Sequence, residues 1–294
     1  MTNRRVFLQA GGVACFAAGA AKPFRLGLVT RVRDPQADLA KVQGLGLPTC
    51  FIYTDDYRPA LATEVRSALD RYRIEVTGVE SLGPGETVWD FTKGPLTIGL
   101  VPRRYRRQRL DALKRASDWG KLLDIPCLQT HCGFIPEDPN DPLYDETVQA
   151  VRELASHCQG NQQSFVFETG QETPVTLSRT IQDVGMNNVG VGLDTGNLIL
   201  YGKANPADAV EVLGKYVRTV HAKDGLYPTD PRKLGTEVPI GEGRVDFRRV
   251  LAGLRQCGYA GALTIEREVS GPRQAEDVRR AKAYLEKLMA EVAS

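Results

Sequence analysis

The sequence lacks the features that mark several classes of protein. Its 294 residues include six cysteines, none of them in a C-x-x-C pair, so the pattern does not indicate a disulfide framework. Lysine and arginine together exceed aspartate and glutamate by only 38 − 36 = 2. A general nucleic-acid-binding protein should carry a clearer basic excess, so no nucleic-acid partner is expected.

Long apolar runs are absent except at the amino terminus. The run 6–21 follows the pair Arg4 and Arg5 and is 16 residues long, shorter than the roughly 20 residues needed to span a bilayer. Small residues near its end offer an Ala-x-Ala cleavage site. The pattern predicts a twin-arginine-type signal peptide over residues 1–21, export to the periplasm and no stable membrane insertion.

Eight short runs rich in β-branched residues alternate with segments of helical period through the rest of the chain. Parallel strands need a crossover between neighbours, and a helix is the usual crossover. The alternation therefore predicts an α/β protein with a single (β/α)8 TIM barrel as one domain over residues 22–294. The strands are expected at 24–30, 49–54, 74–81, 126–133, 164–170, 189–196, 217–224 and 261–268.

Amphipathic helices are expected between these strands. The clearest are predicted at 106–124, 145–158, 205–216 and 245–259. Two long segments, 81–103 and 225–244, follow the third and seventh strands and contain several glycines and prolines. They leave the carboxyl ends of strands, where barrel enzymes build their active sites, so we interpret them as walls of a site rather than domain boundaries.

Ionisable residues end the last four predicted strands. They are Glu168, Asp194, His221 and Glu266, and each follows an apolar run. Burying an ionisable group there is costly unless a partner or a metal compensates it. One such residue alone is more often a hydrogen-bonded strand end, but four at matching positions predict a divalent metal site. Three carboxylates and one imidazole suit Mn²⁺, Mg²⁺, Co²⁺ or Zn²⁺.

Further residues are expected beside these four. Side chains alternate along a strand, so Lys223 should point the same way as His221, and Glu268 the same way as Glu266. Lys223 either polarises a substrate oxygen or forms a salt bridge. His131 ends the fourth strand. It binds substrate or orients Glu168, or else it is a hydrogen-bonded core histidine.

Two other patterns allow a structural explanation. The arginine-rich segment 102–109 is interpreted as the solvated or salt-bridged face of a helix rather than a phosphate site. Trp89 either stacks on a sugar or packs within its own loop. Glu80, at the end of the third strand, is expected more weakly to line the same rim.

Five segments in this order, FETGQE, GLDTGN, VHAKDG, PIGEGRVDF and TIERE, resemble those of the xylose isomerase-like TIM-barrel superfamily, a group of sugar phosphate isomerases and epimerases. The likeness extends over roughly residues 24–290. Where several epimerase relatives have a histidine, this chain has Asn197, so its substrate contacts should differ. The resemblance implies Glu168 and Glu266 as the acid/base pair. It also implies that one divalent metal is held by Glu168, Asp194, His221 and Glu266.

The expected chemistry is proton transfer next to a sugar carbonyl, with a divalent cation stabilising the enediolate. We expect a metal-dependent isomerase or epimerase of a keto- or aldo-sugar, and export favours an unphosphorylated one. The alternatives are a keto-glycoside lyase or inosose-type dehydratase, and a catalytically silent sugar-binding barrel. Family resemblance also allows a homo-oligomer. The expected substrate-binding residues are His131, Lys223, Asn197 and Glu268.

Overall fold

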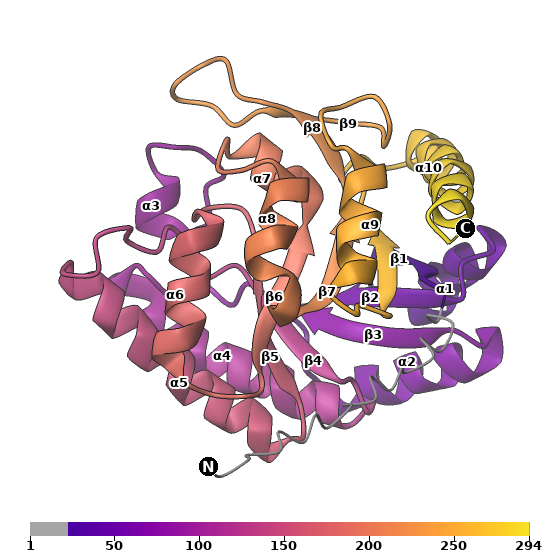
Figure 1. The fold of residues 1–294 in the computed structure, drawn as a ribbon. Helices are drawn as coiled ribbons and strands as arrows, with labels where there is room; N and C mark the ends of the chain where they lie inside the picture. Colours follow the sequence, from indigo (N-terminus) through magenta and orange to yellow (C-terminus); the bar gives the residue numbers. More distant parts are fainter. Residues whose placement is uncertain (1–22, 294) are drawn as a thin grey trace, which may run out of the picture.

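The computed structural model describes residues 23–293 (Figure 1). The predicted signal peptide lies outside these residues, so it stays a prediction. Within residues 23–293, no helix is both long and apolar enough to cross a membrane.

Eight parallel strands close into a barrel, which confirms the predicted fold. Their order around the barrel is β1-β10-β7-β6-β5-β4-β3-β2. Every pairing between neighbouring barrel strands is parallel. The strands are β1 (Arg25–Arg31), β2 (Thr49–Tyr53), β3 (Glu75–Glu80), β4 (Cys127–Thr130), β5 (Ser164–Glu168), β6 (Val189–Asp194), β7 (Val217–Ala222) and β10 (Ala262–Ile265).

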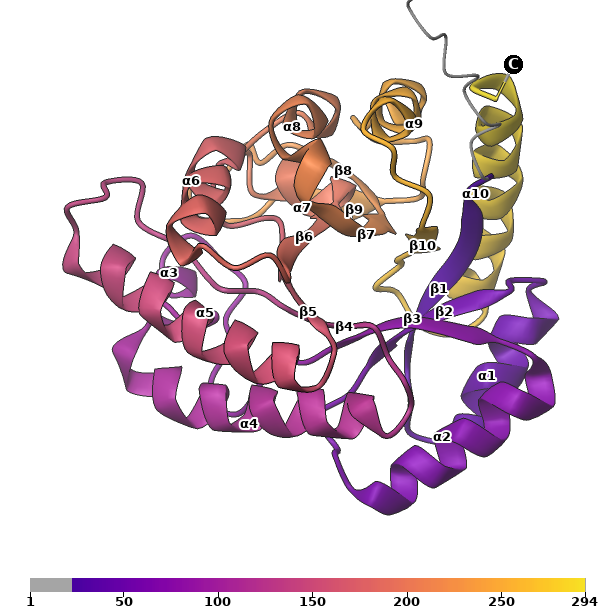
Figure 2. The ribbon, with the colours of Figure 1, turned by 60° about the horizontal axis from the view of Figure 1, so that its bottom comes forward.

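Helices surround the barrel, and α4 and α5 lie side by side on its outside (Figure 2). Many of them begin with a proline, because its fixed φ suits the first turn of a helix. Proline has no N–H, but a backbone N–H in the first turn would have no partner within the helix. The helices are α1 (Pro35–Gly44), α2 (Pro59–Tyr72), α3 (Gly94–Thr97), α4 (Arg103–Lys121), α5 (Pro142–Gly160), α6 (Pro174–Val184), α7 (Thr195–Leu200), α8 (Pro206–Leu213), the 3₁₀ turn η1 (Gly214–Tyr216), α9 (Phe247–Gln256) and α10 (Pro272–Glu291).

Several strands end earlier than predicted. The predicted strand 189–196 stops at Asp194 because α7 begins at the next residue, and the Asp194 carboxylate caps it by accepting from the backbone N–H of Asn197 at 2.7 Å. The predicted strand 261–268 stops at Ile265, so Glu266 lies in the following loop. The shorter strands still deliver their last polar side chains to the same rim.

The two long loops contain short elements that the sequence did not reveal. Segment 81–103 includes α3, and segment 225–244 includes β9 (Thr236–Val238). β9 pairs antiparallel with β8 (Asp224–Leu226), a strand that begins inside the predicted strand 217–224. Figure 1 shows this two-stranded sheet beside α7, with its connecting loop projecting beyond the barrel.

One buried arginine holds the loop after β3. Arg109 on α4 is fully buried, and its guanidinium donates to backbone carbonyls of Pro84, Glu86, Thr97 and Gly99 at 2.7–3.1 Å. The interpretation of segment 102–109 as a solvated face is therefore wrong at this position, because the loop covers it.

The remaining arginines of this segment agree with the salt-bridged alternative. Arg103 and Arg106 pair with Glu146 on α5, and Arg107 pairs with Asp111 on its own helix.

One buried aspartate holds the loop after β7 in a similar way. The carboxylate of Asp224 accepts from the backbone N–H groups of Gly225, Gly241, Gly243 and Val245 at 2.8–3.1 Å. A Cβ on Gly243 would lie 2.0 Å from that carboxylate, so only glycine allows this approach. Sequence analysis gave Asp224 no role, since its partners lie up to 21 positions away.

Arg109→Ala should lower the free energy of unfolding by about 3 kcal/mol, because buried carbonyls lose their donor. Chemical denaturation measures the change. Arg107→Ala on the exposed face of the same helix is the control and should stay within about 0.5 kcal/mol of the wild type. Equal stability of the two variants would contradict the role given to Arg109.

Asp224→Asn should destabilise the protein by about 2 kcal/mol, since an amide nitrogen would then face two backbone N–H donors. Thermal unfolding checks this expectation, with the exposed Asp230→Asn as the control. A wild-type melting temperature for Asp224→Asn would show that the loop does not depend on this carboxylate.

Candidate active site

The four predicted ligands converge at the carboxyl ends of β5, β6, β7 and β10. One ligand atom from each of Glu168, Asp194, His221 and Glu266 lies within 4.8 Å of those of the other three. Glu168, Asp194 and His221 are buried, whereas the Glu266 side chain is 15% exposed. Nδ1 of His221 lies 3.2 Å from an oxygen of Glu168 and 3.2 Å from an oxygen of Glu266. This group of four, which we call the carboxylate cluster, could hold a metal ion.

Each carboxylate of the cluster keeps one buried oxygen without a hydrogen bond. These atoms are Oε2 of Glu168, Oδ2 of Asp194 and Oε2 of Glu266. A buried acceptor left without a partner costs about 1–3 kcal/mol, more when it is charged. Two of them nevertheless lie against an imidazole nitrogen, Oε2 of Glu266 at 3.2 Å from His221 and Oε2 of Glu168 at 3.3 Å from His131. Three carboxylates beside an imidazole form a donor set that suits a divalent cation.

The carboxylates and the imidazole shift one another's pKa values. Burial alone would raise the pKa of Glu168, but His131 and His221 outweigh it and lower that pKa to about 2. Burial would lower the pKa of His221, yet Glu168 and Glu266 raise it well above its ordinary value. Burial and the same two glutamates raise the pKa of Asp194. Protons and a divalent cation are alternative ways of balancing this charge.

The inner barrel supports His221 from below. The ring of Phe51 meets the imidazole edge-on, with 4.7 Å between ring centroids. The side-chain amide of Gln129 lies 3.4 Å from Nε2 of His221 and accepts from the Thr219 hydroxyl at 2.7 Å. Gly192 leaves room for that amide, because a Cβ there would lie 2.2 Å from its oxygen. Sequence analysis missed Gln129, whose type alone carries no signal for such a role.

Lys223 lies beside the cluster, as the alternation along β7 predicted. Its buried ammonium forms an ion pair with Glu268, donates to Oδ1 of Asn197 at 3.3 Å and lies 3.8 Å from Glu266. Burial would lower the pKa of Lys223, but the surrounding carboxylates raise it. The salt-bridge alternative is therefore present, and it keeps the ammonium next to a predicted catalytic carboxylate.

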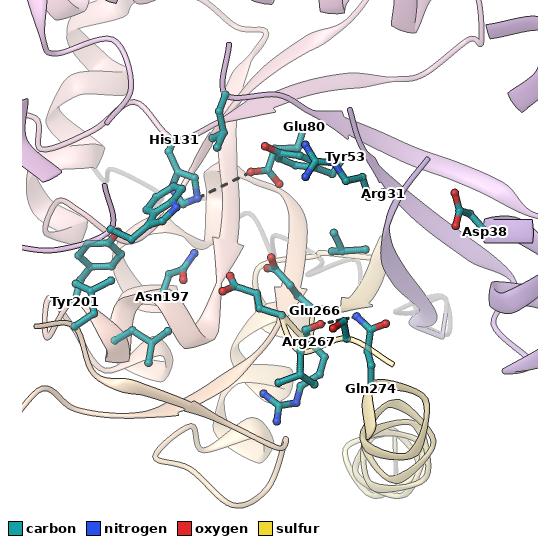
Figure 3. A pocket seen from close by; sticks show the side chains of 18 of the residues that line it. Arg31, Asp38, Tyr53, Glu80, His131, Asn197, Tyr201, Glu266, Arg267 and Gln274 are labelled. Carbon is teal, nitrogen blue, oxygen red and sulfur yellow. Dashed lines mark hydrogen bonds and ion pairs between the residues drawn. The ribbon is translucent and has the colours of Figure 1, made fainter. Parts of the chain in front are cut away.

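His131 lies directly after β4 on the other side of Glu168. Its Nδ1 forms a hydrogen bond with the Gln171 amide at about 3.1 Å, and its Nε2 lies 3.3 Å from Oε2 of Glu168. Nε2 also lies 4.0 Å from Glu80 (Figure 3), which confirms that this weaker candidate reaches the rim. Burial and the nearby Glu168 raise the pKa of Glu80. Gln171 is a further partner that sequence analysis missed.

A cavity of about 720 Å³ opens over the cluster, within the range of roughly 300–1,000 Å³ typical of ligand pockets. Its lining includes Glu266, His131, Asn197 and Glu268 (Figure 3). Trp89 forms an aromatic wall, with its ring edge-on to His131 at 5.0 Å. Trp89 therefore faces the cavity rather than packing only within its own loop. All four expected substrate-binding residues lie at or beside this space, and their roles stay predictions.

Comparisons with known proteins place this chain among similar barrels. A solved xylose isomerase domain protein from Planctomyces limnophilus is 32% identical, with a TM-score of 0.87 over 92% of this chain and 99% of that one. A D-tagatose 3-epimerase-like protein is 20% identical, with a TM-score of 0.72 over 92% of this chain and 98% of that one, and this likeness concerns the fold.

An uncharacterized protein of Methanocaldococcus jannaschii is 28% identical over 211 residues, which cover 67% of this chain and 66% of the relative, just under two thirds. Residues 39–288 match the family described as xylose isomerase-like TIM barrel. With most of the chain matched and the barrel closed, the protein belongs to the xylose isomerase-like TIM-barrel family.

Proposed function

We propose that the protein is a divalent-metal-dependent sugar isomerase or epimerase that moves a proton next to the carbonyl of a keto- or aldo-sugar. The observation that carries this proposal is the set of three carboxylates around His221, each with a buried oxygen that makes no hydrogen bond, beside a ligand-sized cavity. The likeness to an epimerase-like barrel supports the same class of reaction.

Glu168, Asp194, His221 and Glu266 would hold the metal, each through one atom. A bound divalent cation supplies Lewis acidity, which stabilises negative charge developing on the substrate oxygens. The donor set accepts Mn²⁺, Mg²⁺, Co²⁺ or Zn²⁺. A silent sugar-binding barrel has no need for such a set, so the buried carboxylates favour an enzyme.

Glu168 and Glu266 carry the proton transfer in this proposal. Each has an oxygen 3.2 Å from the same nitrogen of His221, so the two carboxylates flank one small volume. One carboxylate removes the proton, and the other returns a proton to the substrate. Return to the opposite face of the same carbon gives an epimer, and return to the neighbouring carbon gives an aldose-ketose isomer.

Neighbouring side chains position the substrate. The Lys223 ammonium lies 3.8 Å from Glu266, so a substrate oxygen near that carboxylate can also accept from Lys223. His131 holds Glu168 from the opposite side. The Trp89 ring lies edge-on to His131 in the cavity wall, where it can contact a sugar.

The proposal includes export to the periplasm, which rests on the predicted signal peptide at residues 1–21. Sugar phosphates are mostly cytoplasmic, so an exported enzyme would act on an unphosphorylated sugar.

Asp194→Asn should lower Mn²⁺ affinity by more than about 100-fold, since loss of even an indirect metal contact costs 10–100-fold. Asparagine keeps the oxygen that caps α7, so the fold should persist. Calorimetric titration of the metal-free protein measures the affinity, and Asp230→Asn is the exposed control. Retained affinity in Asp194→Asn would show that the cluster does not hold the metal.

Mn²⁺-loaded protein in D₂O should place deuterium on a carbon next to the carbonyl of its substrate, as followed by proton NMR over a panel of ketoses, aldoses and 3-keto-glycosides. Glu266→Gln and Glu168→Gln should each slow this exchange by about 10²–10⁴-fold, the usual contribution of a general acid or base. Glu276→Gln, exposed on α10, should not.

Loss of a leaving group from a keto-glycoside would instead identify the lyase alternative. Absence of exchange and of product across the whole panel would support the silent barrel.

A further inference from the structure

The cavity carries a second group of charged side chains, on the β1 side and away from the carboxylate cluster. Arg31 ends β1, Arg33 follows two positions later, and both line the cavity. Alternation explains the placement of Arg31, because Val29 packs inside the barrel and residues two apart on a strand point to the same side. Arg33 lies beyond the end of β1. Figure 3 shows Arg31 beside Tyr53, across the cavity from Glu266.

The Arg31 guanidinium is held in place but has spare donors. It stacks on the ring of Tyr53, 4.6 Å from the ring centroid. Stacking uses the flat face of a guanidinium and leaves the N–H groups at its edge free. Its ion pair is a long contact of 3.5 Å to Asp55. That carboxylate also accepts from Ser81 and Tyr53, so it does not saturate Arg31.

The Arg33 side chain has no ion pair or hydrogen bond among residues 23–293. Its backbone, by contrast, is fixed. Oδ2 of Asp38 accepts from the N–H groups of Arg33 and Asp34 at 2.8 and 3.0 Å. Asp38 also lines the cavity, and these two bonds hold its carboxylate at the backbone of Arg33, although it keeps its negative charge.

The third arginine of the cavity lining, Arg267, has a structural role. Arg267 is buried and pairs with Glu237 and Asp277, each at 2.9 Å. Arg31 and Arg33 have no comparable partners, although they face the same cavity. Their charge is therefore available to a ligand.

We propose that Arg31 and Arg33 bind an anionic group at the end of the substrate remote from its carbonyl, so that the substrate is an acidic sugar. A carboxylate or a phosphate would pair with guanidinium edges through charge-assisted hydrogen bonds. Carboxylates at one end of the cavity and arginines at the other would also orient the ligand, because an anion is repelled from the cluster. This inference rests on the proposed function in taking the bound sugar to be the substrate.

Three ketoses that differ only at carbon 6 test the inference: D-fructose, D-fructuronate and D-fructose 6-phosphate. Calorimetric titration of the Mn²⁺-loaded protein at low salt should show at least one charged ketose binding about 10–100-fold more tightly than fructose. Tighter binding of fructuronate would assign the site to carboxylates. Tighter binding of fructose 6-phosphate would assign it to phosphates and would contradict the proposed export. The preference should shrink as salt is added.

Arg31→Gln and Arg33→Gln should each lower the affinity for the preferred charged ketose by a larger factor than the affinity for fructose, and so reduce the preference. Arg279→Gln, an exposed position on α10 outside the cavity lining, is the matched control and should keep the preference. The inference would be overturned if the three ketoses bound with equal affinity or if neither charged ketose bound. It would also be overturned if the preference survived in the double variant, which carries both Arg31→Gln and Arg33→Gln.

Deuterium exchange measured on the same samples separates the two proposals. A charge preference without exchange would leave the anion site standing and remove the isomerase. Exchange on fructose without any charge preference would support the isomerase and remove the anion site.

Discussion

The structure depends on how buried negative charge is balanced at the carboxyl end of the barrel. Glu168, Asp194 and Glu266 bring three carboxylates within 4.8 Å of one another, and most of this group is buried. The nearby cations His221 and Lys223 cannot engage every oxygen, and one buried oxygen of each carboxylate makes no hydrogen bond. A fold that needed only stability would replace such a group by apolar side chains. The buried carboxylates therefore argue for a bound cation and for chemistry at this place.

The same criterion separates structural from functional polar residues elsewhere on the rim. Asp224 is buried close to the cluster, but four backbone N–H groups fill its carboxylate, so it has no capacity left for a ligand. Arg109 is likewise consumed by loop carbonyls. Arg33, with no partner among the described residues, lies at the other extreme. Charged side chains whose hydrogen-bonding positions are all filled by protein partners thus hold loops in place, whereas those with few partners are candidates for ligand contacts.

Sequence reasoning found the parts of the site that periodicity controls. His221, Lys223, Glu266 and Glu268 follow from alternation at strand ends, because a parallel barrel brings all carboxyl ends to one rim. The roles of residues whose partners depend on the course of a loop could not be predicted from the sequence. Arg109 was assigned to a solvated face because nothing local shows that segment 81–103 folds back over α4. Gln129 and Gln171 escaped for a related reason, since each matters only through a histidine from a distant part of the chain.

The two proposed catalytic carboxylates differ in their access to solvent, and this difference bears on the chemistry. The Glu168 side chain is 1% exposed and lies against His131, whereas Glu266 is 15% exposed and lines the cavity beside Lys223. If Glu168 removes the proton, Glu266 returns one, and its more exposed carboxylate exchanges protons with D₂O more readily. If Glu266 removes the proton, the shielded Glu168 returns one that exchanges more slowly. The extent of label uptake in one turnover therefore depends on which carboxylate returns the proton.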